Sequence, residues 1–134
     1  MIEMSAEESA AFLGDQEWVV LGTLDPDGSP WADVVPSIVR DGRLFFRVPA
    51  SSRSERNIRR DARVCCTQDE NQSYFEIRGV IAHGEAERIA SGRAPAEIET
   101  RPDPLHPGAT PSGEVYSITL SDIVSFDFAR IRAR

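Results

Sequence analysis

Residues 19–48, VVLGTLDPDGSPWADVVPSIVRDGRLFFRV, decide the fold class, because three runs rich in β-branched and aromatic residues alternate there with two turn signals. The first signal, Asp25-Pro26-Asp27-Gly28, is strong turn chemistry, and the second, Asp41-Gly42, is a preferred two-residue hairpin turn. The stretch therefore predicts an antiparallel meander of three strands, over residues 17–24, 31–39 and 43–48.

A short helix is predicted before the meander. Ser5 followed three residues later by Glu8 is the capping-box pattern, in which each side chain bonds the other residue's backbone N–H. The apolar residues that follow run to Gly14, and glycine commonly ends a helix. The pattern predicts an amphipathic helix that leads into the first strand.

A second helix is predicted directly after the meander. Pro49 ends the third strand, and residues 50–61 are polar, with Ile58 as their only large apolar side chain. Such a segment is too polar for another buried strand. We therefore expect a loop that opens into a short helix, capped by Ser52 or Ser54.

The rest of the chain returns to strand patterns. Residues 73–89 are long enough for one bent strand, with Gly79 and Gly84 at bulge or bend positions. Residues 90–113 hold five of the nine prolines and are expected to wrap the surface. Further strands are expected at residues 62–68, 115–120 and 123–128. Together, six or seven short strands and two helices predict a small antiparallel β-barrel, with a β-sandwich as the alternative.

The size and composition fit one folded domain spanning residues 1–134. Hydrophobic residues make up 40% of the chain and charged residues 28%, which is typical of a soluble globular protein. No apolar run reaches the roughly 18 residues that a membrane span needs. The N-terminal sequence is acidic and polar, unlike a signal peptide, so we expect a cytoplasmic protein without membrane partners.

The distribution of charge favours one local anion site. The net charge of -7 argues against a general nucleic-acid-binding protein, and residues 51–61 lack the aromatic side chains of an oligonucleotide-binding barrel. Hydroxyl groups, free backbone N–H groups and guanidinium groups at a helix start can converge on one phosphate. The arginines of this segment are Arg53 and Arg56, near the helix start, and Arg59 and Arg60, further along, where we expect a smaller contribution. The alternative is a solvated basic helix face paired with carboxylates.

Taken in order, the N-terminal helix and the segments VVLGTLDPDGSP, VVPSIVRDGRLFFRV and SRSERNIRRDARV resemble the pyridoxamine 5'-phosphate oxidase-like family of flavin-binding split barrels. The resemblance is good from Phe12 to about Gly84 and rests on the combination of segments. It implies a mainly β fold, a six-stranded antiparallel split β-barrel with an N-terminal helix and a short helix after the third strand. It also implies a homodimer with two flavin mononucleotides (FMN) in grooves along the interface.

The resemblance implies which residues bind the cofactor. The phosphate would be bound by the basic and hydroxyl cluster after the third strand, Ser52, Arg53, Ser54, Arg56 and Asn57. The isoalloxazine ring would lie against the backbone of the second and third strands, at Val35, Pro36, Ser37, Arg47 and Val48. Many relatives have lysine at the position of Ser54 and a small hydroxyl residue at that of Arg47. Trp31 is expected to be a core or interface residue that borders the ring.

The implied activity is that of an FMN-dependent oxidoreductase acting on a small molecule, in which the cofactor carries the hydride and no side-chain acid is required. The Arg-x-His substrate motif of true pyridoxamine phosphate oxidases and their arginine- and tryptophan-rich C-terminal segment are absent, so that reaction is not assigned. Related split barrels use a deazaflavin coenzyme in the same groove, and others bind flavin or haem without turnover. These alternatives stay open, and no catalytic residue is assigned.

The cysteines and histidines do not predict a metal site. Cys65 and Cys66 are adjacent, so on a strand they point to opposite faces, which excludes an ordinary disulfide between them. With His83 they still lack a fourth ligand at a metal-binding spacing. His106 lies in the proline-rich segment, where we expect a solvated imidazole. Burial of one cysteine as a small hydrophobic residue is the expected outcome.

Overall fold

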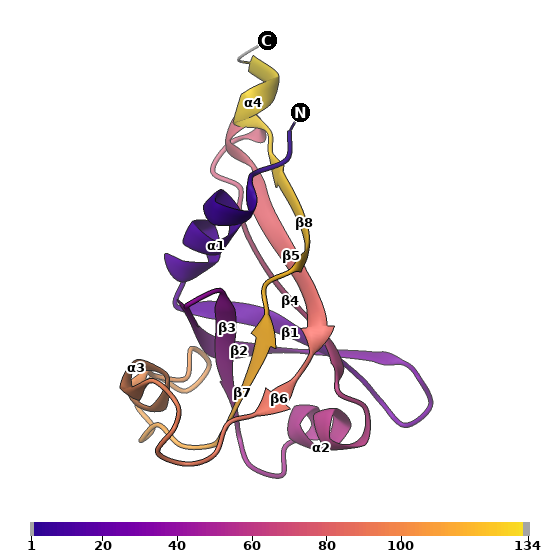
Figure 1. Cartoon of the computed structure of the whole chain (residues 1–134), viewed down its shortest axis with the longest axis vertical. Coiled ribbons are helices and arrows are strands. Elements are labelled where there is room, and N and C mark those ends of the chain that lie inside the picture. Colours follow the sequence, from indigo (N-terminus) through magenta and orange to yellow (C-terminus); the bar gives the residue numbers. More distant parts are fainter. Residues whose placement is uncertain (1, 133–134) are drawn as a thin grey trace.

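The computed structural model (Figure 1) describes residues 2–132, which form eight strands in one antiparallel sheet, four α-helices and one short 3-10 helix. The strands are β1 (Trp18–Leu24), β2 (Pro30–Arg40), β3 (Arg43–Val48), β4 (Arg63–Glu70), β5 (Arg78–Glu85), β6 (Glu87–Arg88), β7 (Glu114–Thr119) and β8 (Asp122–Asp127). The helices are α1 (Ala6–Gly14), α2 (Arg53–Arg60), α3 (Ala96–Thr100) and α4 (Ala129–Arg132), and the 3-10 helix η1 spans Tyr74–Glu76. Within the described residues, no helix is long and apolar enough to cross a membrane.

The sheet curls into a half-barrel. Strands β5 and β6 lie near opposite ends of the sheet but follow each other almost directly in the chain, so the two ends must come close together. The strand order is β6-β7-β3-β2-β1-β4-β5-β8. Only Ala86 separates β5, near one end of the sheet, from β6 at the other end. The curl brings β5 against β7, so that a side chain on Gly84 would lie 3.1 Å from the Cβ of Ile118. Figure 1 shows β5 passing into β6, and β7 into β8, across the barrel.

One hydrophobic core fills the barrel. Burial alternates along β1, where Val19 and Leu21 are fully buried and their neighbours are partly exposed. The rings of Phe46 and Tyr116 stack in this core with centroids 6.0 Å apart. The helix α1 adds Leu13 to the core, which agrees with the amphipathic pattern of its sequence. Alternating burial is what a sheet with one face on a core requires.

The turns and helix caps follow the local sequence signals. Asp41 and Gly42 have φ angles of 52° and 75°, the two left-handed residues that a type I′ hairpin needs. Gly28 donates its N–H to the carbonyl of Asp25 at 2.9 Å and closes the first predicted turn. The capping box at the start of α1 is present, and Ser52 rather than Ser54 caps α2.

The expected number of six strands is wrong, because the described residues form eight. The run expected as one bent strand at residues 73–89 divides into η1, β5 and β6, and its bend falls at Ala86. Gly79 lies inside β5 instead, where an added Cβ would approach the ring of Phe126 to 2.6 Å. The barrel closure that forces this bend depends on contacts distant in sequence, which the local pattern does not contain.

Residues 90–113 do more than wrap the surface. Their short helix α3 buries Ile98 fully, and Ile98 packs with Ile38 and Val115 in a second, smaller hydrophobic cluster. The segment thus covers the face of β2 and β3 that points away from the main core. In Figure 1, α3 and α2 lie on opposite sides of the same end of the barrel.

A row of four apolar residues and one threonine crosses the outward face of five neighbouring strands of the sheet. The strand register aligns one residue from each of β2, β1, β4, β5 and β8, and we call this set the outer row: Val34, Val20, Thr67, Ile81 and Val124. All five are partly or fully exposed, and Val124 is 53% exposed. A contiguous apolar strip on a protein surface commonly marks an interaction site.

Candidate functional site

The predicted anion site lies where α2 meets the turn between β1 and β2. An open hollow of about 620 Å³, which we call the α2 hollow, has these lining residues: Asp25, Pro26, Asp27, Arg53, Arg56, Asn57 and Arg60. Three arginines therefore face the same space. Arg60, which we expected to contribute less than Arg53 and Arg56, is one of them, whereas Arg59 is not.

A buried carboxylate fixes α2 to the barrel. Glu55 is only 2% exposed, and its Oε2 accepts hydrogen bonds from Tyr116 of β7 at 2.5 Å and from Arg59 at 2.7 Å. Burial alone would raise the pKa of Glu55, but the bonds from Arg59 and Tyr116 hold it below its ordinary value. Burial and the bond to Glu55 raise the pKa of Tyr116 to about 12. Both groups thus keep the protonation state that the bond requires near neutral pH.

The guanidinium group of Arg53 is held from two sides. Its Nε and Nη2 donate to the two carboxylate oxygens of Asp25, at 3.0 and 2.5 Å. Its Cζ lies 3.8 Å from the centroid of the Trp31 ring, a cation–π contact. Trp31 is oriented in turn, because its Nε1 donates to Asp33 at 3.0 Å. Arg53 is therefore oriented before any ligand binds.

Of the two carboxylates that line the hollow, Asp25 accepts more hydrogen bonds than Asp27. The amide of Asn57 donates to Asp25 at 2.9 Å and to the hydroxyl of Thr23 at 3.0 Å. The hydrogen bonds from Arg53 and Asn57 lower the pKa of Asp25 to about 2, so the group is ionised at neutral pH. Its side chain is only 10% exposed.

The five residues predicted to bind phosphate separate into two groups. Arg53, Arg56 and Asn57 line the α2 hollow. The hydroxyl of Ser52 instead accepts the N–H of Glu55 as the helix cap, and the buried Ser54 donates its hydroxyl to Asp33 at 2.5 Å. In this arrangement the serine hydroxyls stabilise the loop, and the cationic and amide groups remain at the hollow.

The residues predicted to border the ring are covered on one side by the proline-rich segment. Arg47 is 3% exposed and donates to the backbone carbonyls of Ile98, Arg101 and Ser112, which ties residues 98–112 to β3. Arg101 donates to the carbonyl of Ser37 at 3.1 Å. The remaining predicted positions, Val35, Pro36 and Val48, are also buried. The sequence contained no signal for this role of Arg47, because its acceptors lie 51 to 65 positions away.

The cysteines lie on opposite faces of β4, as their adjacency requires. Cys66 is fully buried, and burial raises the pKa of its thiol. Cys65 is half-buried and lies over Gly22, where a Cβ would come within 2.7 Å of its Sγ. Among residues 2–132, no group of three His, Cys, Asp or Glu side chains is placed to hold a metal ion. His106 is exposed in the proline-rich segment.

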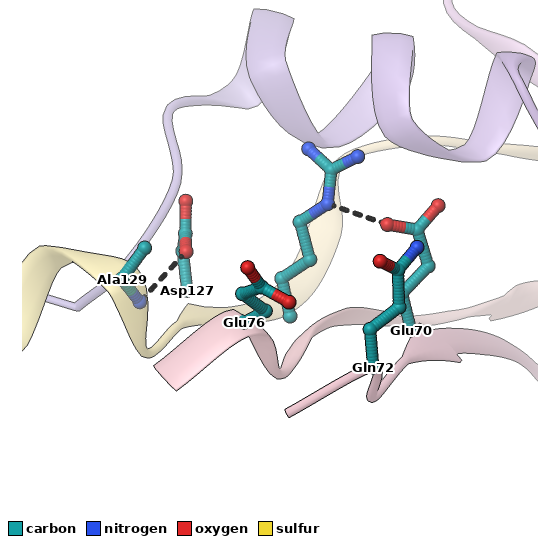
Figure 2. Close-up of a pocket in the computed structure, with 6 residues that line it drawn as sticks. Glu70, Gln72, Glu76, Asp127 and Ala129 are labelled. Carbon is teal, nitrogen blue, oxygen red and sulfur yellow. Dashed lines mark hydrogen bonds and ion pairs between the residues drawn. The ribbon is translucent and has the colours of Figure 1, made fainter. Parts of the chain in front are cut away.

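A second hollow, of about 290 Å³, lies at the other end of the barrel, between the end of β4, η1 and the start of α4 (Figure 2). Its one arginine, Arg78, donates to Glu70 at 2.9 Å, and Asp127 accepts the N–H of Ala129 at 3.1 Å. Glu76 adds a third carboxylate. Three carboxylates against one paired arginine disfavour a phosphate, so the α2 hollow is the better candidate for an anion site.

Comparison with known proteins identifies a family that the chain matches. Residues 5–132 match the family model described as pyridoxamine 5'-phosphate oxidase. No curated protein sequence matches the chain. A conserved hypothetical protein from Mycobacterium tuberculosis, Rv2991, superposes with a TM-score of 0.81 at 25% identity, covering 98% of this chain and 89% of that one.

Two further solved structures share the fold at lower identity. The FAD-binding protein from Mycobacterium smegmatis superposes with a TM-score of 0.69 at 15% identity, covering 91% of this chain and 95% of that one. A protein described as an F420 reductase superposes with a TM-score of 0.66 at 16% identity, covering 85% of this chain and 94% of that one. At these identities the similarity concerns the fold alone.

Proposed function

Because the chain belongs to the pyridoxamine 5'-phosphate oxidase family, we propose that it binds a flavin-type cofactor and uses it to oxidise or reduce a small molecule. The observation that carries the proposal is the α2 hollow, where three arginines and Asn57 surround a space large enough for a phosphate group. Guanidinium groups at the start of a helix are well suited to phosphate, because their paired donors match its oxygens.

FMN is the cofactor we propose, with its phosphate in the α2 hollow and its ring along β2 and β3. Strand β2 starts at Pro30, and its second residue, Trp31, stacks on Arg53 of the hollow. A rise of about 3.4 Å per residue puts Val35 about 14 Å beyond Trp31. That span suits an extended phosphate-bearing chain that ends in a flat ring. The ring would then lie against the backbone of β2 at Val35, Pro36 and Ser37 and of β3 at Arg47 and Val48.

The chain's own contribution would be binding and orientation. Arg53 and Arg56 would bind the phosphate, and Asn57 would orient it through its amide. Bound flavin supplies the hydride chemistry. The backbone of β2 and β3 would hold the ring flat, and the segment 94–113, tied down by Arg47, would shield one side of it from water.

A deazaflavin coenzyme is the alternative cofactor, because its phosphate would use the same arginines. One solved structure with this fold is an F420 reductase, and another is an FAD-binding protein. Binding of a flavin or haem without turnover is the alternative to catalysis.

The released cofactor tests this proposal. We expect the purified protein to carry or take up a yellow ligand whose absorbance is bleached by reduction, and mass spectrometry of the denatured sample to identify FMN. A deazaflavin in that sample would support the alternative cofactor. Haem in the sample, or a colourless protein that takes up none of FMN, FAD and a deazaflavin, would contradict the proposed function.

We also propose a homodimer, with the outer row as the contact between protomers. Four of the five members of the row are apolar, the row crosses five strands, and Val20 and Ile81, on either side of Thr67, are only half-buried in the single chain. A two-fold axis lets one apolar strip pack on its own copy, which is the simplest way to remove it from water.

Substitution in the outer row tests the dimer. Val124→Arg should convert the dimer to a monomer at micromolar concentration, because the charge would be buried against the partner without a counter-ion. Leu105→Arg is the matched control, since Leu105 is 58% exposed and lies outside the row. Sedimentation velocity measures both. A monomeric wild type, or a Val124→Arg variant that stays dimeric, would refute this interface.

A further inference from the structure

The α2 hollow already contains an anionic side chain, that of Asp25. The carboxylate of Asp25 accepts two hydrogen bonds from Arg53 and one from Asn57, at distances of 2.5 to 3.0 Å. The Asp25 side chain is 10% exposed and that of Arg53 is 49% exposed, so the pair is partly open to water at the hollow. Asp25 therefore occupies the donors that the proposed function assigns to a phosphate.

We propose that Asp25 is a built-in competitor for the anion site, which a phosphate must displace from Arg53 and Asn57 in order to bind. The proposal rests on the proposed function, and it states what limits the affinity of the α2 hollow for a phosphate. Asp25 occupies the edge of the Arg53 guanidinium formed by Nε and Nη2, whose two parallel donors also match two phosphate oxygens, so a phosphate that binds this edge replaces Asp25. The displaced carboxylate also repels the incoming anion, because both remain in one small hollow.

The contacts around Asp25 allow this exchange without refolding of the turn. The turn is closed by backbone bonds, from Asp25 N–H to the Ser29 carbonyl at 2.8 Å and from Gly28 N–H to the Asp25 carbonyl at 2.9 Å. Rotation of the Asp25 side chain leaves both bonds in place. A change of rotamer at Asp25 would therefore release Arg53 and Asn57 without opening the turn.

Asp25 is not the only group that holds Arg53 at the hollow. Its guanidinium group lies on the ring of Trp31, and Trp31 is bonded to Asp33, which also accepts the hydroxyl of Ser54. None of these contacts involves Asp25. Arg53 is thus the cation that stays at the hollow, and Asp25 is the anion that a phosphate replaces. The free energy needed to displace Asp25 lowers the affinity for the phosphate.

The test removes the charge of Asp25 and keeps its shape. Asp25→Asn retains an oxygen acceptor for Arg53 and suits a turn. Asp27→Asn is the matched control, because Asp27 lines the same hollow but its carboxylate accepts the N–H of Ser29. FMN and riboflavin binding are measured by flavin fluorescence at constant ionic strength. Inorganic phosphate binding is measured by the rise in unfolding temperature.

We expect Asp25→Asn to bind FMN about tenfold more tightly than wild type, and to gain more stability from inorganic phosphate. Asp27→Asn should change FMN affinity by less than about threefold, and riboflavin affinity should be the same in all three proteins. Asp25→Ser serves as a second variant if Asp25→Asn folds poorly, with the same expected direction.

The outcomes separate this proposal from the proposed function. If wild type prefers FMN to riboflavin but Asp25→Asn binds FMN no more tightly, the competitor role is refuted and the flavin site stands. If phosphate stabilises Asp25→Asn more than wild type while neither binds FMN, the competitor role stands and the flavin assignment falls. If neither protein responds to FMN or phosphate, both are refuted.

Discussion

Replacing Arg53 by alanine is expected to weaken FMN binding by about tenfold to hundredfold, because a charge-assisted hydrogen bond to the phosphate is lost. Arg53 stacks on the ring of Trp31 with its Cζ 3.8 Å from the ring centroid, a contact that holds it at the hollow and does not involve Asp25. Arg56→Ala should have an effect of the same kind, because Arg56 lines the same hollow. Calorimetric titration with FMN measures both.

Arg88→Ala is the matched control for these variants. Arg88 is an exposed arginine paired with Glu114 on β6 and β7, away from the α2 hollow, so its loss should leave FMN affinity unchanged. The unfolding temperature of the Arg53 variant should change little, because the side chain is half-exposed. If wild type and the Arg53 and Arg56 variants bind FMN with equal affinity, the assignment of the phosphate to the α2 hollow is wrong.

The second large effect is expected on stability. Arg47→Met should lower the free energy of unfolding by about 3–5 kcal/mol, because it removes the charged donors of three backbone carbonyls and leaves them under-satisfied. Those carbonyls belong to Ile98, Arg101 and Ser112, so the proline-rich segment should also detach from β3. Urea unfolding measures the first effect, and faster proteolysis within residues 94–113 measures the second.

Arg93→Met is the control for this variant, since Arg93 is exposed in the same part of the chain. It should change the free energy of unfolding by less than about 0.5 kcal/mol. An Arg47→Met protein as stable as wild type, with unchanged proteolysis, would show that the buried arginine does not hold the segment.

The parts of the fold that depend on neighbouring residues were predictable from the sequence. The hairpin at Asp41-Gly42 forms because those two residues tolerate the left-handed conformation, and the capping box at Ser5 forms because its partner is three residues away. The polar segment after Pro49 becomes α2 for the same local reason. Each of these signals lies within a few residues of the structure it specifies.

The parts that depend on distant contacts were not predictable. Strand β6 is separate from β5 because barrel closure bends the chain at Ala86. The bond from Tyr116 to Glu55 joins residues 61 positions apart, and the pair of Arg53 with Asp25 joins residues 28 positions apart. The sequence predicts arginines at a helix start, but it does not show which carboxylate they bind in the folded chain.

The affinities of wild type for FMN and for riboflavin, two ligands that differ only in the phosphate, test the proposed phosphate site directly. We expect wild type to bind FMN at least about tenfold more tightly than riboflavin at the same ionic strength, since only FMN has a phosphate that reaches the arginines of the α2 hollow. Equal affinity for the two ligands, or binding of neither FMN nor FAD nor a deazaflavin, would contradict the proposed phosphate site.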